Sequence, residues 1–252
     1  MKIDLSNKNI LVTGASRGIG KAIAEQLLKS GAKVAAHYNS SPVRPEGLSA
    51  EELESLSTFK ADLSSADETA ALFDEVVKSM GHLDVIINNA GLAIISDVEE
   101  PVTDFVSKWQ TTMAVNLQAT AILCKQGILH FSARKSGIII NISSRAAFRG
   151  DTSEYLAYAA SKGGVVALTR SIARAYGKQG IVAFNIAPGF VQTDMANEFI
   201  EVYGEGIVKD DIALADLTQP EDLAPIITLL ASGLANHATG GTFDINAGSY
   251  VH

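Results

Sequence analysis

Cysteine, long apolar runs and leader-like segments are all scarce in this sequence. Cys124 is the only cysteine among 252 residues, so no intrachain disulfide can form. No apolar run approaches the roughly 18 residues of a membrane-spanning helix, and the first residues lack the apolar segment of a signal peptide. We therefore expect a cytoplasmic protein that does not act in a membrane. Cys124 follows three apolar residues in a helical pattern, which indicates a buried, unreactive thiol.

Positive charge and metal-binding patterns are also scarce. The chain has 20 Lys and Arg against 28 Asp and Glu and no long basic run, which argues against nucleic acid or an anionic membrane as the main partner. The five histidines are scattered without metal-ligand spacing, so we predict no catalytic metal. A hydrophobic fraction of 47% is typical of globular proteins, and the length suits one domain over residues 1–252.

What is present is a regular alternation of short apolar runs with longer amphipathic ones. This order predicts a doubly wound α/β fold of the Rossmann type, with about seven parallel strands and helices on both faces. Its ligands should lie beyond the carboxyl ends of the strands. The expected strands are Asn9–Thr13, Lys33–His37, Asp84–Asn88, Gly137–Ser143, Val182–Ala187 and Thr242–Ile245, and the expected long helices are Gly18–Ser30, Ala66–Ser79, Thr103–Arg134, Ser153–Tyr176 and Pro220–Ala231.

Two stretches break this rhythm. Asn39–Gly47 holds two prolines and a glycine, which predicts a loop before a short helix over Ala50–Ser57. Asp194–Leu217 has no clean period and follows Pro188-Gly189, so we interpret residues 194–217 as a mobile flap that covers the substrate, with an ordinary surface insertion as the alternative.

A glycine-rich turn follows the first strand and opens directly into a helix. Gly14, Gly18 and Gly20 have the spacing G-x-x-x-G-x-G. Glycine permits close approach of backbone to phosphate, and a helix N-terminus offers free N–H groups. In this strand–turn–helix context we interpret the turn as a pyrophosphate site rather than as a simple glycine-rich turn.

Tyr158 and Lys162 are four residues apart in a helix-compatible run and so share one face. A free tyrosine has a pKa of about 10, and a nearby cation favours the phenolate, so the pair could exchange a proton with substrate. The spacing alone is more common between surface neighbours. Tyr155 is a rival phenol, but Ala159 stands four residues beyond it.

Seven motifs in order resemble those of the short-chain dehydrogenase/reductase family, and in particular its members that reduce 3-oxoacyl thioesters. They span nearly the whole chain. They are the glycine turn Thr13–Gly20, Asp62-Leu63, Asn88-Asn89-Ala90-Gly91, Asn116, Ser143-Ser144, Tyr158 with Lys162, and Pro188–Thr193.

The resemblance implies reversible hydride transfer between a nicotinamide and a carbonyl carbon. It implies that Ser144 polarises the carbonyl oxygen while Tyr158 donates the proton that this oxygen needs. Lys162 would hold the nicotinamide ribose and lower the pKa of Tyr158. Asn116 would keep a water on the proton path to Lys162, with a polar residue that kinks a helix as the alternative.

The resemblance also implies a cofactor site. Asp62 would meet the adenine, while Thr193 and the Val191 backbone would hold the nicotinamide amide. The full expected set is Gly14, Ser16, Arg17, Gly18, Ile19, Gly20, Tyr38, Asn39, Ser40, Asp62, Leu63, Asn89, Ala90, Gly91, Tyr158, Lys162, Pro188, Gly189, Val191 and Thr193.

The cofactor is expected to be NADP(H) rather than NAD. A carboxylate at the end of the second strand would repel a 2′-phosphate by about 4 kcal/mol per charge pair at 4 Å and intermediate dielectric. This chain has Tyr38 there, followed by Asn39 and Ser40, with no carboxylate. Arg17 stands in the glycine turn, where NADP-using relatives often carry a basic residue.

The segment between Ser144 and Tyr158 departs from the commonest family form. It is one residue longer and carries Arg145 and Arg149, which would bind an anionic substrate or act as solvated charges or intersubunit salt bridges. The resemblance also implies a homotetramer built on the two long helices; Phe105 and Trp109 are candidates for the core, with the interface as the alternative.

We therefore expect an NADPH-dependent reductase of a ketone or 3-oxoacyl group. The alternatives are an NADP-linked alcohol or sugar dehydrogenase working oxidatively and a non-catalytic cofactor-sensing protein. The intact Ser, Tyr and Lys set argues against the last of these.

Overall fold

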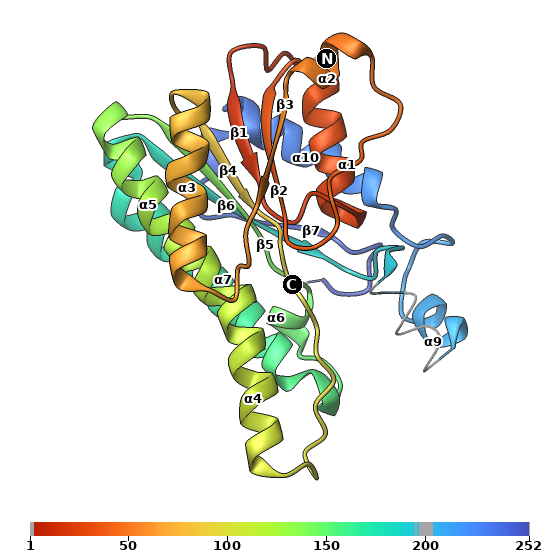
Figure 1. Cartoon of the computed structure of the whole chain (residues 1–252). Helices are drawn as coiled ribbons and strands as arrows, with labels where there is room; N and C mark the ends of the chain where they lie inside the picture. The colour runs from red at the N-terminus through yellow and green to blue at the C-terminus, as the bar shows by residue number, and fades with distance from the viewer. Residues whose placement is uncertain (1–2, 195, 197–203, 252) are drawn as a thin grey trace.

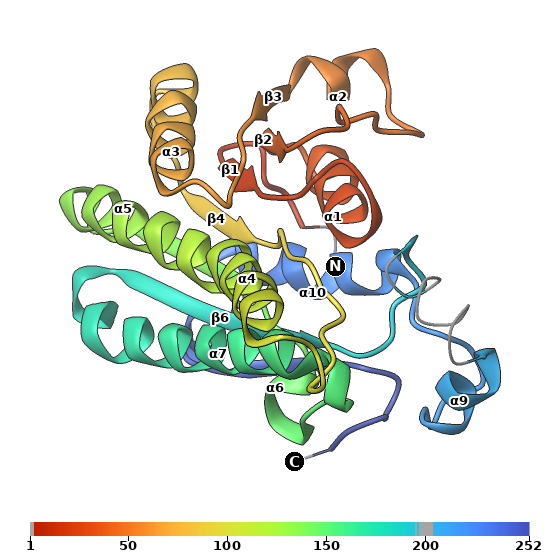
Figure 2. The ribbon, with the colours of Figure 1, turned by 60° about the horizontal axis from the view of Figure 1, so that its bottom comes forward.

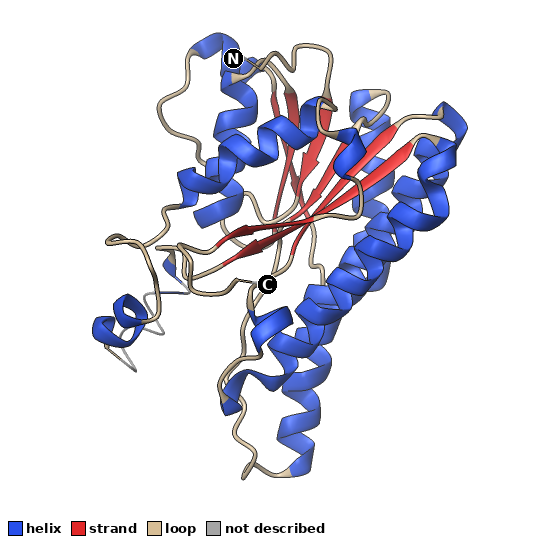
Figure 3. Cartoon of the chain, turned by 180° about the vertical axis from the view of Figure 1, so that it is seen from behind, coloured by secondary structure: helices blue, strands red, loops and turns tan. Residues whose placement is uncertain are grey.

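The computed structural model of the chain describes residues 3–194, 196 and 204–251. It contains one sheet of seven parallel strands in the order β3-β2-β1-β4-β5-β6-β7 (Figures 1 and 3). The strands are β1 Asn9–Val12, β2 Lys33–Tyr38, β3 Leu56–Lys60, β4 Val85–Asn88, β5 Gly137–Ile142, β6 Ile181–Pro188 and β7 Thr242–Ile245. The predicted doubly wound fold with about seven strands is confirmed.

Helices cover both faces of the sheet (Figure 2). On one face α1 and α10 share a core cluster with Ile10 and Val12, and on the other α3, α5 and α7 share one with Leu11, because alternate residues of a strand face opposite sides. The helices are α1 Gly18–Lys29, α2 Ala50–Glu54, α3 Ala66–Met80, α4 Val102–Met113, α5 Ala119–Arg134, α6 Ala146–Arg149, α7 Leu156–Tyr176, α9 Glu205–Asp210 and α10 Pro220–Ser232, with 3₁₀ turns at Ser153–Tyr155, Gly177–Gln179 and Asn236–Ala238.

The structure bears on two expectations about these helices, the burial of Cys124 and the lack of a membrane-spanning segment. Cys124 is buried on α5, and burial raises the pKa of its thiol to about 12, which confirms an unreactive thiol. None of the helices over the described residues is long and apolar enough to cross a membrane.

The connection after β2 differs from the prediction of a helix over Ala50–Ser57. The helix α2 ends at Glu54, and its start is held by a reciprocal capping box between Ser49 and Glu52. The edge strand β3 follows and pairs with β2. Its sequence, Leu56-Ser57-Thr58-Phe59-Lys60, has partly exposed polar positions, so it lacks the apolar run that marks the central strands.

The helix predicted over Thr103–Arg134 is interrupted. A π-helical turn over Ala114–Gln118 separates α4 from α5. Phe105 and Trp109 stack on each other on α4 with ring centroids 5.9 Å apart. Both are half-buried and lie outside the two core clusters, so the preferred prediction that they belong to the core is wrong.

The 194–217 segment contains the short helix α9 rather than an unbroken irregular stretch. The two ends of the segment meet, since Val191 forms an isolated bridge with Thr218 and the Gln192 N–H donates to the Thr218 carbonyl at 2.9 Å. Residues 195 and 197–203 of the predicted flap lie outside the described residues.

Substitution of two helical glycines by alanine should change the stability of the fold in opposite directions, because Gly127 on α5 lies close to the sheet and Gly163 on α7 does not. A Cβ added at Gly127 would overlap the terminal methyl of Ile86, which is fully buried and cannot move aside, whereas one added at Gly163 would meet no atom within 4 Å. Gly127→Ala should lower the free energy of unfolding by about 1–3 kcal/mol, while Gly163→Ala should raise it by up to about 1 kcal/mol. Urea unfolding of both variants measures this; equal effects would contradict the close approach.

Candidate active site

The glycine turn after β1 is built for close packing against the end of β4. A Cβ at Gly14, where φ is +65°, would lie 2.9 Å from the Ala90 Cα, and one at Gly20 would lie 2.5 Å from the Asn89 amide nitrogen. The Asn89 amide donates to the carbonyls of Thr13 and Gly14 at 2.9 and 3.2 Å. Only glycine fits these positions, so the turn presents bare backbone at the carboxyl edge of the sheet.

The N-terminus of α1 follows directly. Arg17 is its N-cap residue, in an extended conformation and with no side-chain cap, so the first N–H groups of the helix have no capping partner. Free N–H groups and the helix dipole suit a phosphate. The turn and helix start therefore fit the pyrophosphate of a dinucleotide.

His37 is a residue of this region that motif reading missed. It is buried at the end of β2, where its Nδ1 accepts from the Gly14 N–H at 3.1 Å and its Nε2 lies 3.0 Å from the Ala61 carbonyl. This pattern requires the neutral ring with the proton on Nε2. Burial lowers the pKa of His37 and favours that form. In the sequence, the only indication of this role is that His37 is a polar residue at the end of an otherwise apolar strand.

The expected cofactor residues fall into two groups. One group lines a cavity at the carboxyl ends of the central strands and consists of Ile19, Asn89, Gly91, Tyr158, Lys162, Pro188, Gly189, Val191 and Thr193. The other, outside this cavity, includes Tyr38, Asn39, Ser40 and Asp62, which follow or end β2 and β3.

Two members of the expected set lie differently from the expectation. Leu63 is buried in the core cluster under α3, so its side chain packs in the protein interior. The Arg17 guanidinium bonds Asp194 at 2.9 Å, and both side chains are largely exposed. Arg17 is thus directed toward the start of the 194–217 segment and not toward Tyr38.

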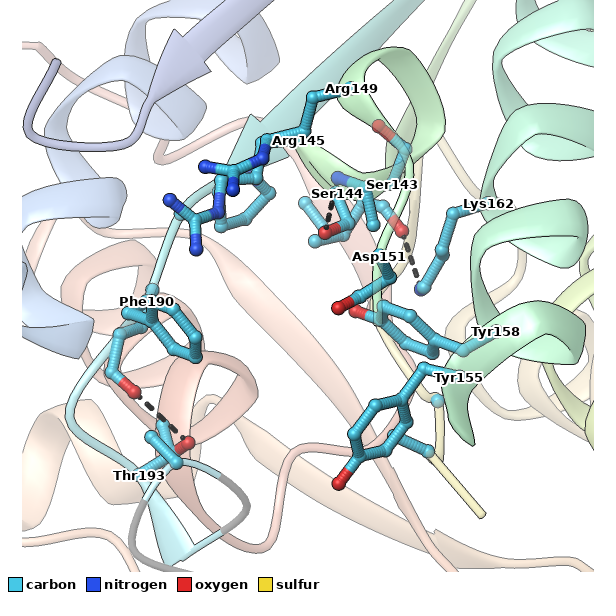
Figure 4. Close-up of a pocket in the computed structure, with 18 of the residues that line it drawn as sticks. Ser143, Ser144, Arg145, Arg149, Asp151, Tyr155, Tyr158, Lys162, Phe190 and Thr193 are labelled. Carbon is cyan, nitrogen blue, oxygen red and sulfur yellow. Dashed lines mark hydrogen bonds between the residues drawn. The ribbon is translucent and has the colours of Figure 1, made fainter. Parts of the chain in front are cut away.

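Ser144, Tyr158 and Lys162 meet in a cavity of about 460 Å³ (Figure 4). Ser144 follows β5, and its Oγ accepts from the Ala146 N–H at 3.1 Å. Tyr158 and Lys162 project from the first two turns of α7. The buried Lys162 ammonium donates to the Ile142 carbonyl at 3.0 Å and lies 5.7 Å from the centre of the Tyr158 ring.

Burial shifts the pKa values of this pair in opposite directions. Burial raises the pKa of Tyr158 to about 12, although a hydrogen bond with Ser144 acts in the opposite direction. Burial alone lowers the pKa of Lys162 to about 8. Desolvation of the phenolate is thus the largest influence on the Tyr158 pKa here, and its expected lowering by Lys162 stays a prediction.

Asn116 lies in the π-helical turn and is buried. Its side chain exchanges two hydrogen bonds of 2.9 Å with the backbone of Leu92, and its amide also donates to Ser161 Oγ at 3.0 Å. A Cβ added at Gly91 would lie 3.2 Å from Lys162 Nζ and 3.4 Å from Asn116 Oδ1. Asn116 therefore joins α4–α5 to the loop after β4 beside Lys162.

Arg145 is buried, and both Arg145 and the exposed Arg149 are ion-paired. Arg145 is 8% exposed and bonds Asp211 at 2.5 Å, and Arg149 bonds both oxygens of the same carboxylate at 2.9 and 2.8 Å. Asp211 closes α9, so these ion pairs tie the 194–217 segment to the cavity. Sequence spacing carries no signal for such a pairing over 62 residues or more.

Taken together, the sheet, the turn and the cavity are those of an oxidoreductase that acts on CH–OH or C=O groups with a nicotinamide cofactor. The model of a family described as short chain dehydrogenase matches residues 8–203, and the chain belongs to this family.

Individual relatives extend this comparison. The chain is 34% identical to 3-oxoacyl-[acyl-carrier-protein] reductase of Staphylococcus aureus, over 97% of this chain and 98% of the relative. It is also 34% identical to 3beta-hydroxysteroid dehydrogenase 1 of Eggerthella lenta, over 99% and 96%. Among solved structures, an NADPH-dependent 3-quinuclidinone reductase of Rhodotorula rubra matches with a TM-score of 0.88 and 28% identity, over 98% of this chain and 93% of that one.

The role of His37 predicts a pH dependence of stability. Its folded pKa is lowered below the unfolded value of about 6.5, so the stability it contributes is present above pH 6.5 and is lost as the pH falls below it. His37→Asn retains an acceptor near Gly14 but does not titrate. In urea unfolding from pH 8 to pH 5 the variant should be less stable at neutral pH by about 1 kcal/mol and lose less on acidification.

The remaining acid sensitivity of that variant is assigned to His130, whose Nε2 accepts from the Leu83 N–H and whose pKa burial also lowers. Identical pH profiles for the wild type and His37→Asn would contradict the neutral bridging role of His37.

Proposed function

We propose that the protein is an NADPH-dependent reductase that converts a ketone or 3-oxoacyl group into an alcohol. The observation that carries this proposal is the meeting of Ser144, Tyr158 and Lys162 in one cavity, beside a glycine turn whose backbone fits a pyrophosphate. When bound, the cofactor supplies the hydride that enters the carbonyl carbon. The names of the reductases among the relatives support the same chemistry.

Ser144, Tyr158 and Lys162 each have a different role at the carbonyl oxygen of the substrate. Ser144 Oγ and the Tyr158 hydroxyl converge on one place, as their mutual hydrogen bond indicates. Ser144 donates a hydrogen bond to the oxygen, and Tyr158 transfers its proton as negative charge develops there. Lys162, with a pKa of about 8, remains mostly charged at neutral pH and supplies positive charge beneath the site. Asn116 positions the loop that faces Lys162.

The protonation state of Tyr158 suits its role as proton donor. Burial raises its pKa to about 12, and a protonated phenol is the form that donates. The runner-up function, an NADP-linked alcohol or sugar dehydrogenase, uses the same residues in the opposite direction, so metabolite ratios decide between the two.

The same proposal includes a homotetramer. Its support is a group of exposed apolar side chains on and before α4, namely Val98, Val102 and Val106, next to the stacked Phe105 and Trp109.

We further propose one cofactor-binding domain over residues 1–252, located in the cytoplasm, in which the 194–217 segment covers the substrate.

Tyr158→Phe tests the proton donor. The variant should lose at least about 1,000-fold in kcat because no O–H remains to transfer, while its Kd for NADPH stays within about twofold. Tyr155→Phe is the matched control, since Tyr155 lines the same cavity but has no lysine one turn on; it should lose less than about tenfold. Loss of NADPH absorbance measures both. Turnover by Tyr158→Phe would overturn the mechanism.

Tyr38→Asp tests the cofactor preference. A carboxylate at the end of β2 should repel a 2′-phosphate and raise the KM for NADPH about tenfold or more relative to that for NADH. Tyr38→Asn removes the same ring without adding charge and controls for its loss. A wild-type preference for NADH would contradict the proposal at the outset.

A further inference from the structure

We propose that Arg145 and Arg149 bind a carboxylate of the substrate, so that the physiological substrate is an oxo acid rather than a neutral ketone. This inference rests on the proposed carbonyl reduction and specifies its substrate class. It concerns the wall of the cavity formed by α6, Phe190 and Asp211.

The first support is the state of the Arg145 guanidinium. It directly follows Ser144, is 8% exposed and stacks on the Phe190 ring at 4.4 Å. A guanidinium carries five N–H donors. Within the described residues, the Arg145 side chain donates one hydrogen bond, from Nη1 to the Asp211 carboxylate. Its remaining donors have no hydrogen-bond partner among the described residues, and Arg145 lines the cavity.

The second support is that these two arginines already hold a carboxylate. Both oxygens of Asp211 accept from Arg149, and one also accepts from Arg145. Their guanidinium groups are therefore spaced for a single carboxylate at the edge of the cavity. Asp211 belongs to the 194–217 segment, so a substrate carboxylate can bind beside it or replace it.

The third support is that the arginines and the reacting groups share one cavity. Arg145 and Arg149 line it together with Ser144 and Tyr158. Figure 4 shows both guanidinium groups on the wall above Phe190, across the cavity from Tyr155. An oxo acid can thus place its carbonyl at Ser144 and Tyr158 and its carboxylate at the arginines.

Asp151 is the competing group, because a carboxylate in the cavity would favour a cationic substrate. It accepts from the Thr152 N–H at 2.9 Å and forms no ion pair within the described part of the chain. Desolvation of the Asp151 carboxylate raises its pKa, whereas a guanidinium stays charged at every working pH. The oxo amines in the test below decide between an anionic and a cationic substrate.

The test compares oxo acids with their methyl esters as substrates of the full chain. With NADPH as reductant, 2-, 3- and 4-oxo acids are each paired with the ester and with an oxo amine of similar length. At least one acid should exceed its ester about tenfold in kcat/KM. Arg149→Gln should lower the kcat/KM for the acid about 10- to 100-fold and affect the ester less.

Asp211→Asn separates substrate binding from a purely structural role. Removal of the competing carboxylate should raise the kcat/KM for the acid about two- to fivefold relative to the ester. If the ion pairs of Asp211 only hold the fold together, kcat/KM should fall equally for the acid and for the ester. Arg174→Gln is the control for net charge, since Arg174 is exposed on α7 outside the cavity; it should leave the acid-to-ester ratio unchanged.

The outcomes are distinguishable from failure of the proposed function. Preference for the esters or the oxo amines, or an acid-to-ester ratio that Arg149→Gln does not change, would overturn the carboxylate site while leaving carbonyl reduction intact. If no compound is reduced, the proposed function fails, and calorimetric binding of the oxo acids to wild type and Arg149→Gln still decides the site: equal affinities would overturn it.

Discussion

The hydrogen bond from the buried Lys162 ammonium to the Ile142 carbonyl joins α7 to the carboxyl end of β5, and the arrangement of the candidate active site depends on it. It sets the first turns of α7 beside Ser144, which follows the same strand. It also keeps a charged group in a desolvated place, at the cost of a lowered pKa. The same desolvation raises the pKa of Tyr158 and holds its proton. The contact therefore sets the position of this turn of α7, and burial sets the pKa values of the two side chains on it.

The cofactor side of the site depends on a second set of short contacts, which join three strands. Asn89 after β4 holds the carbonyls of Thr13 and Gly14, and His37 at the end of β2 holds the Gly14 N–H. These bonds orient the turn after β1 so that it presents backbone to a phosphate. Parallel strands end at the same edge, so residues far apart in sequence meet here without a dedicated scaffold.

One wall of the cavity carries two arginines from the short helix α6 and the residue before it. Arg145 and Arg149 from α6 converge on Asp211, and the Arg149 guanidinium also donates to the Ser249 carbonyl at 3.3 Å. Asp211 and the Ser249 carbonyl near the C-terminus are thereby linked through Arg149 to the segment that follows β5. The proposed carboxylate site depends on these two guanidinium groups, which line the same cavity as Tyr158.

The sequence by itself determined the doubly wound sheet, since buried parallel strands such as Gly137–Ile142 need near-continuous apolar runs. Its motifs also singled out Ser144, Tyr158 and Lys162. It did not reveal β3, whose polar edge residues lack an apolar run, the π-helical turn around Asn116, or the role of His37. Only the tertiary structure decided the pKa values and the pairing of Arg145 with Asp211, because desolvation and ion pairs depend on three-dimensional neighbours that sequence spacing does not encode.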